Sequence, residues 1–180
     1  GWEEEVWQCG AAVCQAIGAL LSDVYHQSVD EVEKDAKAIY YLACADVVEE
    51  THQSMEALIH NFNTLHSRAG AQVPFSSINY GMDTSPEGRL ATREVLNAIW
   101  SGLGNGETPI FPVQIFKVKE GVNYNPGDPN YDLFQLALET SAKRLFPNFS
   151  FLDAPFNLQY YRAGDCNTEV AYMGCRTRVI

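Results

Sequence analysis

The chain has 180 residues, of which 46% are hydrophobic, and this fits one globular domain with a sizeable core or a piece of a larger protein. Its formal net charge of -11 argues against a broad electrostatic contact with DNA or RNA, because such contacts depend on Lys and Arg at the phosphates. No apolar run reaches membrane-spanning length, and the acidic start leads into no signal-peptide core. We therefore expect a cytoplasmic protein that has neither a nucleic-acid polymer nor a membrane as a partner.

Two long helical patterns are expected in residues 1–65. The first covers residues 3–21, and the second covers residues 30–62 with Asp30 as its N-cap. The second pattern exceeds a typical globular helix, so it either breaks near residues 50–51 or spans a large scaffold. Such a helical segment would flank a core or form a subunit interface.

Three strands are expected after this helical segment, over residues 72–80, 110–118 and 148–152. Each is rich in aromatic or β-branched residues. Pro74 and Pro112 lie near the start of the first two, where a strand tolerates the missing N–H.

Helices are expected between these strands. Thr84 and Glu87 have the spacing of a capping box, in which Thr84 accepts from the Glu87 N–H, and the helix then runs to about Trp100. A second helix is expected over residues 131–145, ending before the next proline. Strands alternating with helices predict an α/β fold with a parallel sheet in residues 66–180.

The cysteine pattern favours reduced thiols. There is no Cys-x-x-Cys pair, and an odd number does not suit a disulfide framework. No spacing supplies a metal-ligand set, so we expect no metal site in this segment. The five cysteines are Cys9, Cys14, Cys44, Cys166 and Cys175.

Cys175 differs from the other cysteines because it follows a glycine and is flanked by Arg176 and Arg178, whose charges would favour its thiolate. A nucleophilic role would need a nearby base, but all four histidines fall in or beside the helical N-terminal half. A radical role would need a sterically precise loop, a substrate and a radical source, none of which composition can show. From the residues alone, Cys175 is a loop thiol.

Polar residues at the first predicted strand are candidates for substrate contacts. Strand alternation points some of the side chains of Ser76, Ser77 and Asn79 toward an interior, where they could bind a substrate hydroxyl or phosphate. They could equally satisfy backbone groups at the end of the strand. Arg68 and Gln72 flank the start of this strand and are weaker candidates for the same role.

The glycine-rich residues 102–106 resemble a phosphate-binding loop only loosely. They lack the Lys-Ser/Thr ending of a P-loop, and they follow a helix instead of opening one. A helix C-cap and turn is therefore the favoured interpretation.

Five segments carry long and specific motifs. They read HSRAGAQVPFSSINYG at 66–81, GLGNGETPIFP at 102–112, NYNPGDPNYDLF at 123–134, KRLFPNFSFLDAPFN at 143–157 and AYMGCRTRV at 171–179. In these segments the chain resembles the anaerobic (class III) ribonucleotide reductases, the oxygen-sensitive radical enzymes that make deoxyribonucleotides. The resemblance runs from about residue 57 to residue 180 and is weak over the first fifty residues.

The resemblance implies a fold and a reaction. The fold would be half of the ten-stranded α/β barrel shared by ribonucleotide reductases and glycyl radical enzymes, with a finger loop that carries Cys175. In this family the finger-loop cysteine becomes a thiyl radical, which removes the 3′-hydrogen of a ribonucleoside triphosphate. Loss of the 2′-hydroxyl as water follows, and the ring radical is then reduced, with formate as the expected electron source.

The resemblance also implies cofactors and partners. The glycyl radical would lie outside this segment and would be generated by an activating protein that uses S-adenosylmethionine and an iron–sulfur cluster. A structural zinc site and an ATP effector site would also lie outside it. The expected assembly is a homodimer, and the segment by itself is predicted to be inactive.

Two alternatives stay open from the sequence. One is a different glycyl radical enzyme, such as a lyase of the pyruvate formate-lyase type, although the motifs around Cys175 and at residues 66–72 argue against it. The other is a truncated, non-catalytic fragment that binds nucleotide or a partner subunit.

Overall fold

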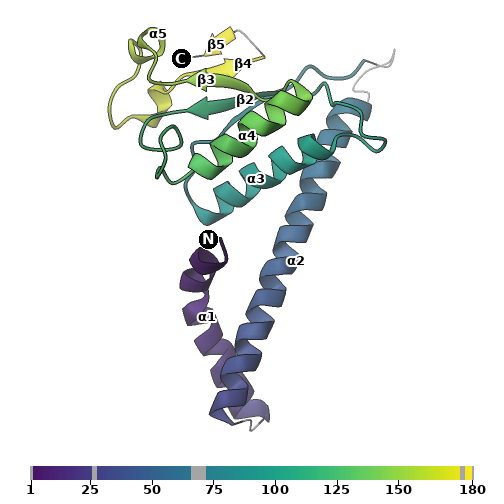
Figure 1. Cartoon of the computed structure of the whole chain (residues 1–180), viewed down its shortest axis with the longest axis vertical. Coiled ribbons are helices and arrows are strands. Elements are labelled where there is room, and N and C mark those ends of the chain that lie inside the picture. Colours follow the sequence, from purple (N-terminus) through teal and green to yellow (C-terminus); the bar gives the residue numbers. More distant parts are fainter. Residues whose placement is uncertain (1, 26–27, 66–71, 175–176, 180) are drawn as a thin grey trace. The chain divides into compact units, whose positions relative to one another are not determined.

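The computed structural model describes residues 2–25, 28–65, 72–174 and 177–179. Figure 1 shows its helices and strands. The chain forms two compact units, residues 1–50 and residues 51–180. The predicted division into residues 1–65 and 66–180 stays a prediction.

The first unit consists of helix α1 (Trp2–Tyr25) and the first part of helix α2 (Val29–Thr64). The two helices approach closely at Gly10, where an added Cβ would overlap the ring of Tyr40. Helix α2 continues without interruption through residues 50–51, so of the two alternatives left open by the sequence, the break is wrong and the single long helix is confirmed.

The start of α2 shows that the predicted N-cap, Asp30, is wrong. The helix begins at Val29, and Asp30 lies inside its first turn instead of at the N-cap. The Ser28 hydroxyl donates to Glu31 Oε2 over 2.6 Å, and the same oxygen accepts from the Ser28 N–H over 3.3 Å. The bond from the Ser28 N–H to Glu31 is one half of a capping box, and the helix begins two residues earlier than it would with Asp30 as the N-cap. The hydroxyl and then the N–H of Ser28 also hold the pKa of Glu31 below its ordinary value.

The second unit is built on a three-stranded parallel sheet in the order β1–β2–β3. Its strands are β1 (Ser77–Tyr80), β2 (Val113–Val118) and β3 (Asn148–Phe151). Ser77 pairs with Val113, and Ile115 pairs with Asn148. The predicted α/β class and parallel sheet are thus confirmed, whereas the ten-stranded barrel stays a prediction.

The first two strands are shorter than predicted, and neighbouring side chains explain why at β2. The N–H groups of Ile110 and Phe111 donate to Asn63 Oδ1 of α2, over 2.9 and 3.0 Å. Asn63 Nδ2 donates in return to the Phe111 carbonyl over 2.6 Å. The backbone at residues 110–111 is therefore bound to a helix side chain, and strand pairing begins only at Val113.

Helix α3 (Pro86–Ser101) is capped by Ser85 and not by Thr84 as predicted. Ser85 Oγ accepts from the Gly88 N–H over 3.1 Å. Proline favours the first helical position, because its fixed φ suits a helix and its missing N–H needs no partner there. Pro86 at that position makes the preceding Ser85 the capping residue.

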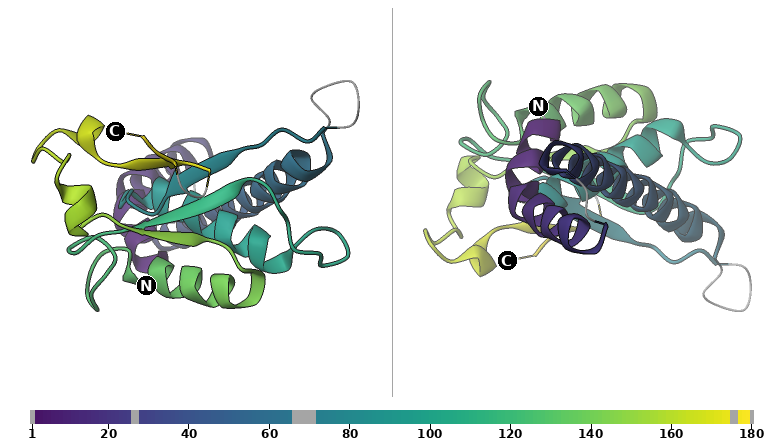
Figure 2. Two further views of the ribbon diagram at one scale, coloured as in Figure 1. Left: turned by 90° about the horizontal axis from the view of Figure 1, so that it is seen from above. Right: turned by 90° about the horizontal axis from the view of Figure 1, so that it is seen from below.

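Helix α4 (Tyr131–Arg144) ends as predicted, just before Pro147. Together with α3 it covers one face of the sheet (Figures 1 and 2). The core between this helical layer and the sheet is formed by five buried residues, Leu96, Phe116, Val118, Leu133 and Ala137.

A second cluster joins α3 to the part of α2 in this unit. Ile59 of α2 is 1% exposed and packs with Val95, Ala98 and Ile99 of α3. Ile78 and Tyr80 of β1 pack against the same cluster. Because strand side chains alternate, the intervening Asn79 and the preceding Ser77 point to the other face of the sheet.

The chain then passes through helix α5 (Pro155–Leu158) and the short 3-10 helix η1 (Cys166–Thr168). It ends in an antiparallel pair, β4 (Ala171–Met173) and β5 (Thr177–Val179), which forms a sheet of its own. Strand β4 contacts β1, so this hairpin lies beside the sheet face away from α3 and α4 (Figure 1).

Candidate functional site

The C-terminal hairpin carries the residue that the sequence singles out. Met173 pairs with Thr177 across the two strands, and residues 174–176 connect them. Cys175 belongs to this connection but, like Arg68, lies outside the residues that the structure describes. The described residues around it therefore define the site.

Asn79 of β1 binds the backbone of β4 through both atoms of its amide. Its Nδ2 donates to the Tyr172 carbonyl over 2.8 Å, and its Oδ1 accepts from the Tyr172 N–H over 2.9 Å. The side chain thus takes the place of a neighbouring strand at one residue of the hairpin.

Ser77 holds the next part of the hairpin. Its Oγ accepts from the Gly174 N–H over 3.0 Å. Gly174 has φ of 66°, in the left-handed region that favours glycine. A Cβ at this position would lie 3.1 Å from the Phe75 ring, so both the conformation and the contact suit glycine.

An ion pair holds the segment that leads into β4. Lys117 of β2 and Glu169 are 2.9 Å apart, with side chains that are 13% and 19% exposed. The next residue, Val170, is buried. The path into the hairpin is therefore fixed to the same sheet face that carries Asn79.

The second strand of the hairpin is bound to helix α5. Arg178 donates to the Phe156 carbonyl over 2.7 Å and contacts Asn157 Oδ1 at 3.4 Å. Its guanidinium also lies over the rings of Phe156 and Tyr160. The predicted effect of this charge on the Cys175 thiol stays a prediction.

The other described candidates for substrate contacts, Ser76 and Gln72, have no described hydrogen bond to the hairpin. The Ser76 hydroxyl is buried and has no hydrogen-bond partner among the described residues. Gln72 is exposed. Ser77 and Asn79 are therefore the two predicted residues that converge on the Cys175 hairpin.

The buried phenol of Tyr80 lies on the helix side of the same strand. Burial raises its pKa well above the ordinary value, so the group stays protonated. It donates to Gln114 Oε1 over 2.6 Å, which satisfies both buried groups. This pair anchors β1 to β2 and provides no base for the hairpin.

Residues 102–106 confirm the helix C-cap interpretation. Gly102 caps α3 with φ of 84°, and its N–H donates to the Ala98 carbonyl. Arg144 of α4 donates to the carbonyls of Trp100, Ser101 and Gly106 and so fixes this turn.

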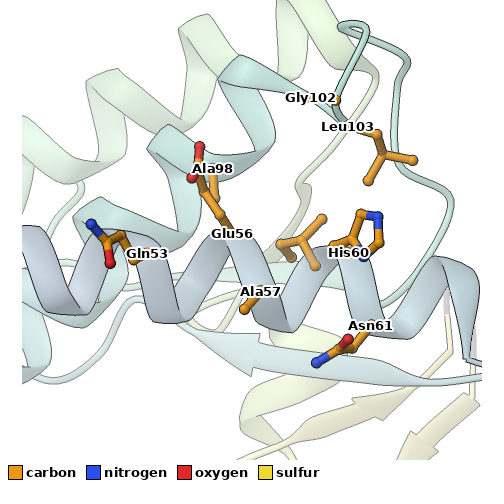
Figure 3. Close-up of a pocket in the computed structure, with 10 residues that line it drawn as sticks. Gln53, Glu56, Ala57, His60, Asn61, Ala98, Gly102 and Leu103 are labelled. Carbon is orange, nitrogen blue, oxygen red and sulfur yellow. The ribbon is translucent and has the colours of Figure 1, made fainter.

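A pocket of about 390 Å³ lies between α2 and this turn. Figure 3 shows His60 of α2 and Leu103 of the turn among the residues that line it. Its other lining residues include Gln53, Glu56 and Ala98. None of the lining residues named for this pocket belongs to the hairpin at residues 171–179.

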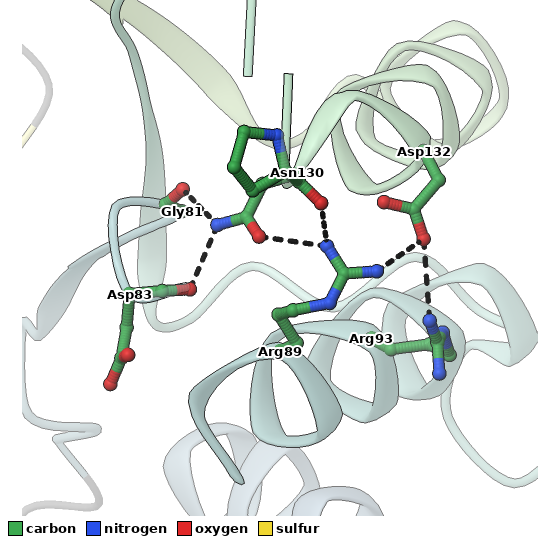
Figure 4. A network of polar contacts seen from close by, with 7 residues as sticks. Gly81, Asp83, Arg89, Arg93, Asn130 and Asp132 are labelled. Atoms are coloured by element: carbon green, nitrogen blue, oxygen red, sulfur yellow. Dashed lines mark hydrogen bonds and ion pairs between the residues drawn. The ribbon is translucent and has the colours of Figure 1, made fainter. Parts of the chain in front are cut away.

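A buried polar network, which the sequence analysis missed, joins the end of β1 to the start of α4 (Figure 4). Arg89 donates to the Pro129 carbonyl, to Asn130 Oδ1 over 2.8 Å and to Asp132 Oδ2 over 3.0 Å. Asn130 is fully buried and donates to the carbonyls of Gly81 and Asp83.

Asn123 adds a second connection to this network. It is also fully buried, and it donates to the carbonyls of Gly81 and Lys117. The two asparagines hold the turns that follow β1 and β2. The sequence did not single out Asn123 and Asn130, because both lie in a segment rich in Gly, Asn and Pro, where asparagine is a common turn residue.

Among the residues that the structure describes, no group of three or more His, Cys, Asp or Glu gathers where a metal ion could bind. None of the described helices is long and apolar enough to cross a membrane.

The chain matches known proteins over almost its whole length. A family model described as anaerobic ribonucleoside-triphosphate reductase matches residues 9–180. The match thus extends further toward the N-terminus than the sequence motifs do.

Curated relatives carry the same description. The anaerobic ribonucleoside-triphosphate reductase of Haemophilus influenzae is 37% identical over 83% of this chain and 19% of its own length. That of Escherichia coli is 37% identical over 72% of this chain and 17% of its own length. That of Enterobacteria phage T4 is 34% identical over 93% of this chain and 27% of its own length. The chain therefore spans about a sixth to a quarter of the length of these relatives.

Proposed function

The chain belongs to the anaerobic ribonucleoside-triphosphate reductase family, and on that premise we propose that it forms the part of a reductase that carries the radical cysteine. The substrate class is a ribonucleoside triphosphate, and the product is the corresponding deoxyribonucleoside triphosphate. The observation that carries this proposal is the family match across residues 9–180, which includes the hairpin with Cys175.

In this proposal Cys175 works as a one-electron carrier. The chemistry that a stored glycyl radical would supply is removal of the hydrogen atom from the Cys175 thiol. The thiyl of Cys175 then takes the 3′-hydrogen of the ribose, and the 2′-hydroxyl departs as water. Formate, oxidised to carbon dioxide, is the proposed source of the two electrons and one proton that the net reduction needs, and a proton from solvent completes the water. The Cys175 thiol then returns its hydrogen atom to C3′ and becomes a thiyl again.

The described surroundings of the hairpin support a positioning role for the protein. Ser77 and Asn79 provide neutral hydrogen-bonding groups to its backbone. Lys117, the one charged residue within the described strands β1, β2 and β3, is paired with Glu169. A radical step needs a fixed distance between the thiol and the substrate more than it needs acid–base groups.

Contacts with the substrate are also part of the proposal. Ser76 has a buried hydroxyl with no partner among the described residues, which a ribose hydroxyl or a phosphate oxygen would satisfy. Gln72 and Arg68 precede it on the chain and stay candidates for the phosphates. Ser77 and Asn79 already bind the hairpin backbone, so they could contact substrate only through the donors and acceptors that these bonds leave unused.

The whole enzyme would need parts that lie outside this segment. We propose an activating protein with S-adenosylmethionine and an iron–sulfur cluster, a structural zinc site, an ATP effector site and a homodimeric assembly. This segment alone would have no turnover, because the stored radical would lie elsewhere.

The proposal is tested by assaying the complete protein after anaerobic activation. We expect deoxycytidine triphosphate from cytidine triphosphate, with formate consumed, and loss of this activity in air. An activated protein with a glycyl radical signal but no deoxynucleotide product would instead favour a different glycyl radical enzyme. A protein that binds nucleotide but forms neither radical nor product would favour the non-catalytic alternative.

A further inference from the structure

We propose that Ser77 and Asn79 are positioning residues that hold the backbone of residues 172–174 and so set the place of Cys175. The inference deepens the proposed function and rests on it, because the position of Cys175 matters to turnover only if its thiol carries the radical. The attachment of the hairpin to the sheet can be tested independently of that function.

The first step is how the hairpin is attached. Strands β4 and β5 pair only with each other, and no described strand of the main sheet continues into them. The described contacts that join β4 and its turn to β1 include three hydrogen bonds, two from Asn79 and one from Ser77. Attachment through side chains means that single substitutions can loosen it without disturbing the sheet.

The second step is the chemistry of these side chains. A backbone peptide offers one donor and one acceptor, and the Asn79 amide presents the same pair to Tyr172. An aspartate would keep the acceptor and lose the donor, and its charge would face the Tyr172 carbonyl. The Ser77 hydroxyl needs only its acceptor side for the Gly174 N–H.

The third step links these bonds to Cys175. Gly174 is joined to Cys175 by a peptide bond, which places consecutive Cα atoms about 3.8 Å apart. A displacement of about 1 Å at a reacting group can cost roughly 100-fold in rate. Loss of the Ser77–Gly174 bond would therefore displace the Cys175 thiol. Ser77 would have this effect without touching the substrate.

A direct test uses amide hydrogen exchange in the complete protein, resolved at single residues by mass spectrometry. In Ser77→Ala we expect exchange at the Gly174 amide to rise by about 2- to 10-fold, the factor that corresponds to one net hydrogen bond. In Asn79→Leu the same rise is expected at the Tyr172 amide. Ser77→Thr keeps the hydroxyl and should restore the wild-type rate at Gly174.

Ser150→Ala is the matched control. Its hydroxyl is buried on β3 and has no hydrogen-bond partner among the described residues. Exchange at the amides of Tyr172 and Gly174 should be unchanged in this variant. Unchanged exchange in Ser77→Ala and Asn79→Leu as well would overturn the proposal.

Turnover of the activated protein gives the second readout. We expect kcat to fall by about 10- to 100-fold in Ser77→Ala and Asn79→Leu, with KM for the nucleotide within about 2-fold and the glycyl radical signal intact. A raised KM with unchanged kcat and unchanged exchange would instead make Ser77 and Asn79 substrate contacts and contradict the proposal. If the wild-type protein makes no deoxynucleotide, the proposed function fails, while the exchange data still decide whether these residues hold the hairpin.

Discussion

At the scale of single residues, the chain uses side-chain amides and guanidinium groups to fix its loops. Asn79, Asn123 and Asn130 each bind backbone groups of a segment that is distant in sequence. Such residues are hard to predict, because a sequence shows which atoms can donate or accept but not which backbone lies opposite. Alternation along the strand identified Ser77 and Asn79 as candidates, but their partners in the hairpin could not be predicted.

Arg89 provides a test at this scale. Its side chain is 10% exposed, and the guanidinium donates to the Pro129 carbonyl, Asn130 Oδ1 and Asp132 Oδ2. In Arg89→Met these acceptors would lose a donor inside the protein, so we expect the local opening free energy of α3 to fall by about 3 kcal/mol. Native-state hydrogen exchange of α3 amides in the complete protein measures this change.

The neighbouring Arg93 is the control. It contacts the same Asp132 at 3.3 Å, but the two side chains are 23% and 52% exposed. Arg93→Met should therefore lower the same free energy by less than about 1 kcal/mol. Equal losses in the two variants would show that the buried network contributes no more than a surface ion pair.

At the scale of elements, aromatic and β-branched composition predicted three strands, and capping and proline signals predicted the helices between them. The ends of these elements were less predictable, because they depend on contacts made elsewhere. Asn63 of α2 binds the backbone at Ile110 and Phe111 and delays the start of β2. The hairpin was missed as secondary structure, since β4 and β5 have three residues each and too few positions to show alternation.

The cap of α3 is a prediction at this scale. Ser85→Ala removes the acceptor of the Gly88 N–H and should lower the stability of the first turn of α3 by about 1 kcal/mol. Thr84→Ala should change it by less than about 0.5 kcal/mol, because Ser85 already caps the helix. Hydrogen exchange at the Gly88 amide distinguishes the two, and a larger effect from Thr84→Ala would restore the capping box predicted from the sequence.

Asp83 predicts a pH dependence at the same helix end. The backbone N–H and then the hydroxyl of Ser85 lower the pKa of its carboxyl below the ordinary value. A lowered pKa in the folded state means that the stabilisation is present above the unfolded-state value of about 4 and is lost as the pH falls through the folded-state pKa. The difference in melting temperature between the complete wild-type protein and Asp83→Asn should therefore shrink below about pH 4. A difference that stays constant from about pH 6 to pH 2 would contradict this assignment.

At the scale of the whole molecule, the segment combines a helix pair with a parallel α/β unit that presents a hairpin on its free sheet face. The long motifs were enough to predict the family, and the alternation of strands and helices was enough to predict the α/β class. The ten-stranded barrel could not be derived in the same way, because a barrel closes through strands beyond the three parallel strands that the structure describes. The chain also spans only about a sixth to a quarter of the length of its curated relatives.

The measurement that tests the account most directly is made on the complete protein with Cys175→Ser, after anaerobic activation. We predict that the glycyl radical signal in electron paramagnetic resonance is retained and that no deoxyribonucleoside triphosphate forms, because a serine hydroxyl does not donate its hydrogen atom in place of a thiol. Cys44→Ser, at a half-buried helix position of the first unit, should keep both the signal and the product. Deoxynucleotide formation by the Cys175→Ser protein would contradict the assignment of the radical to Cys175.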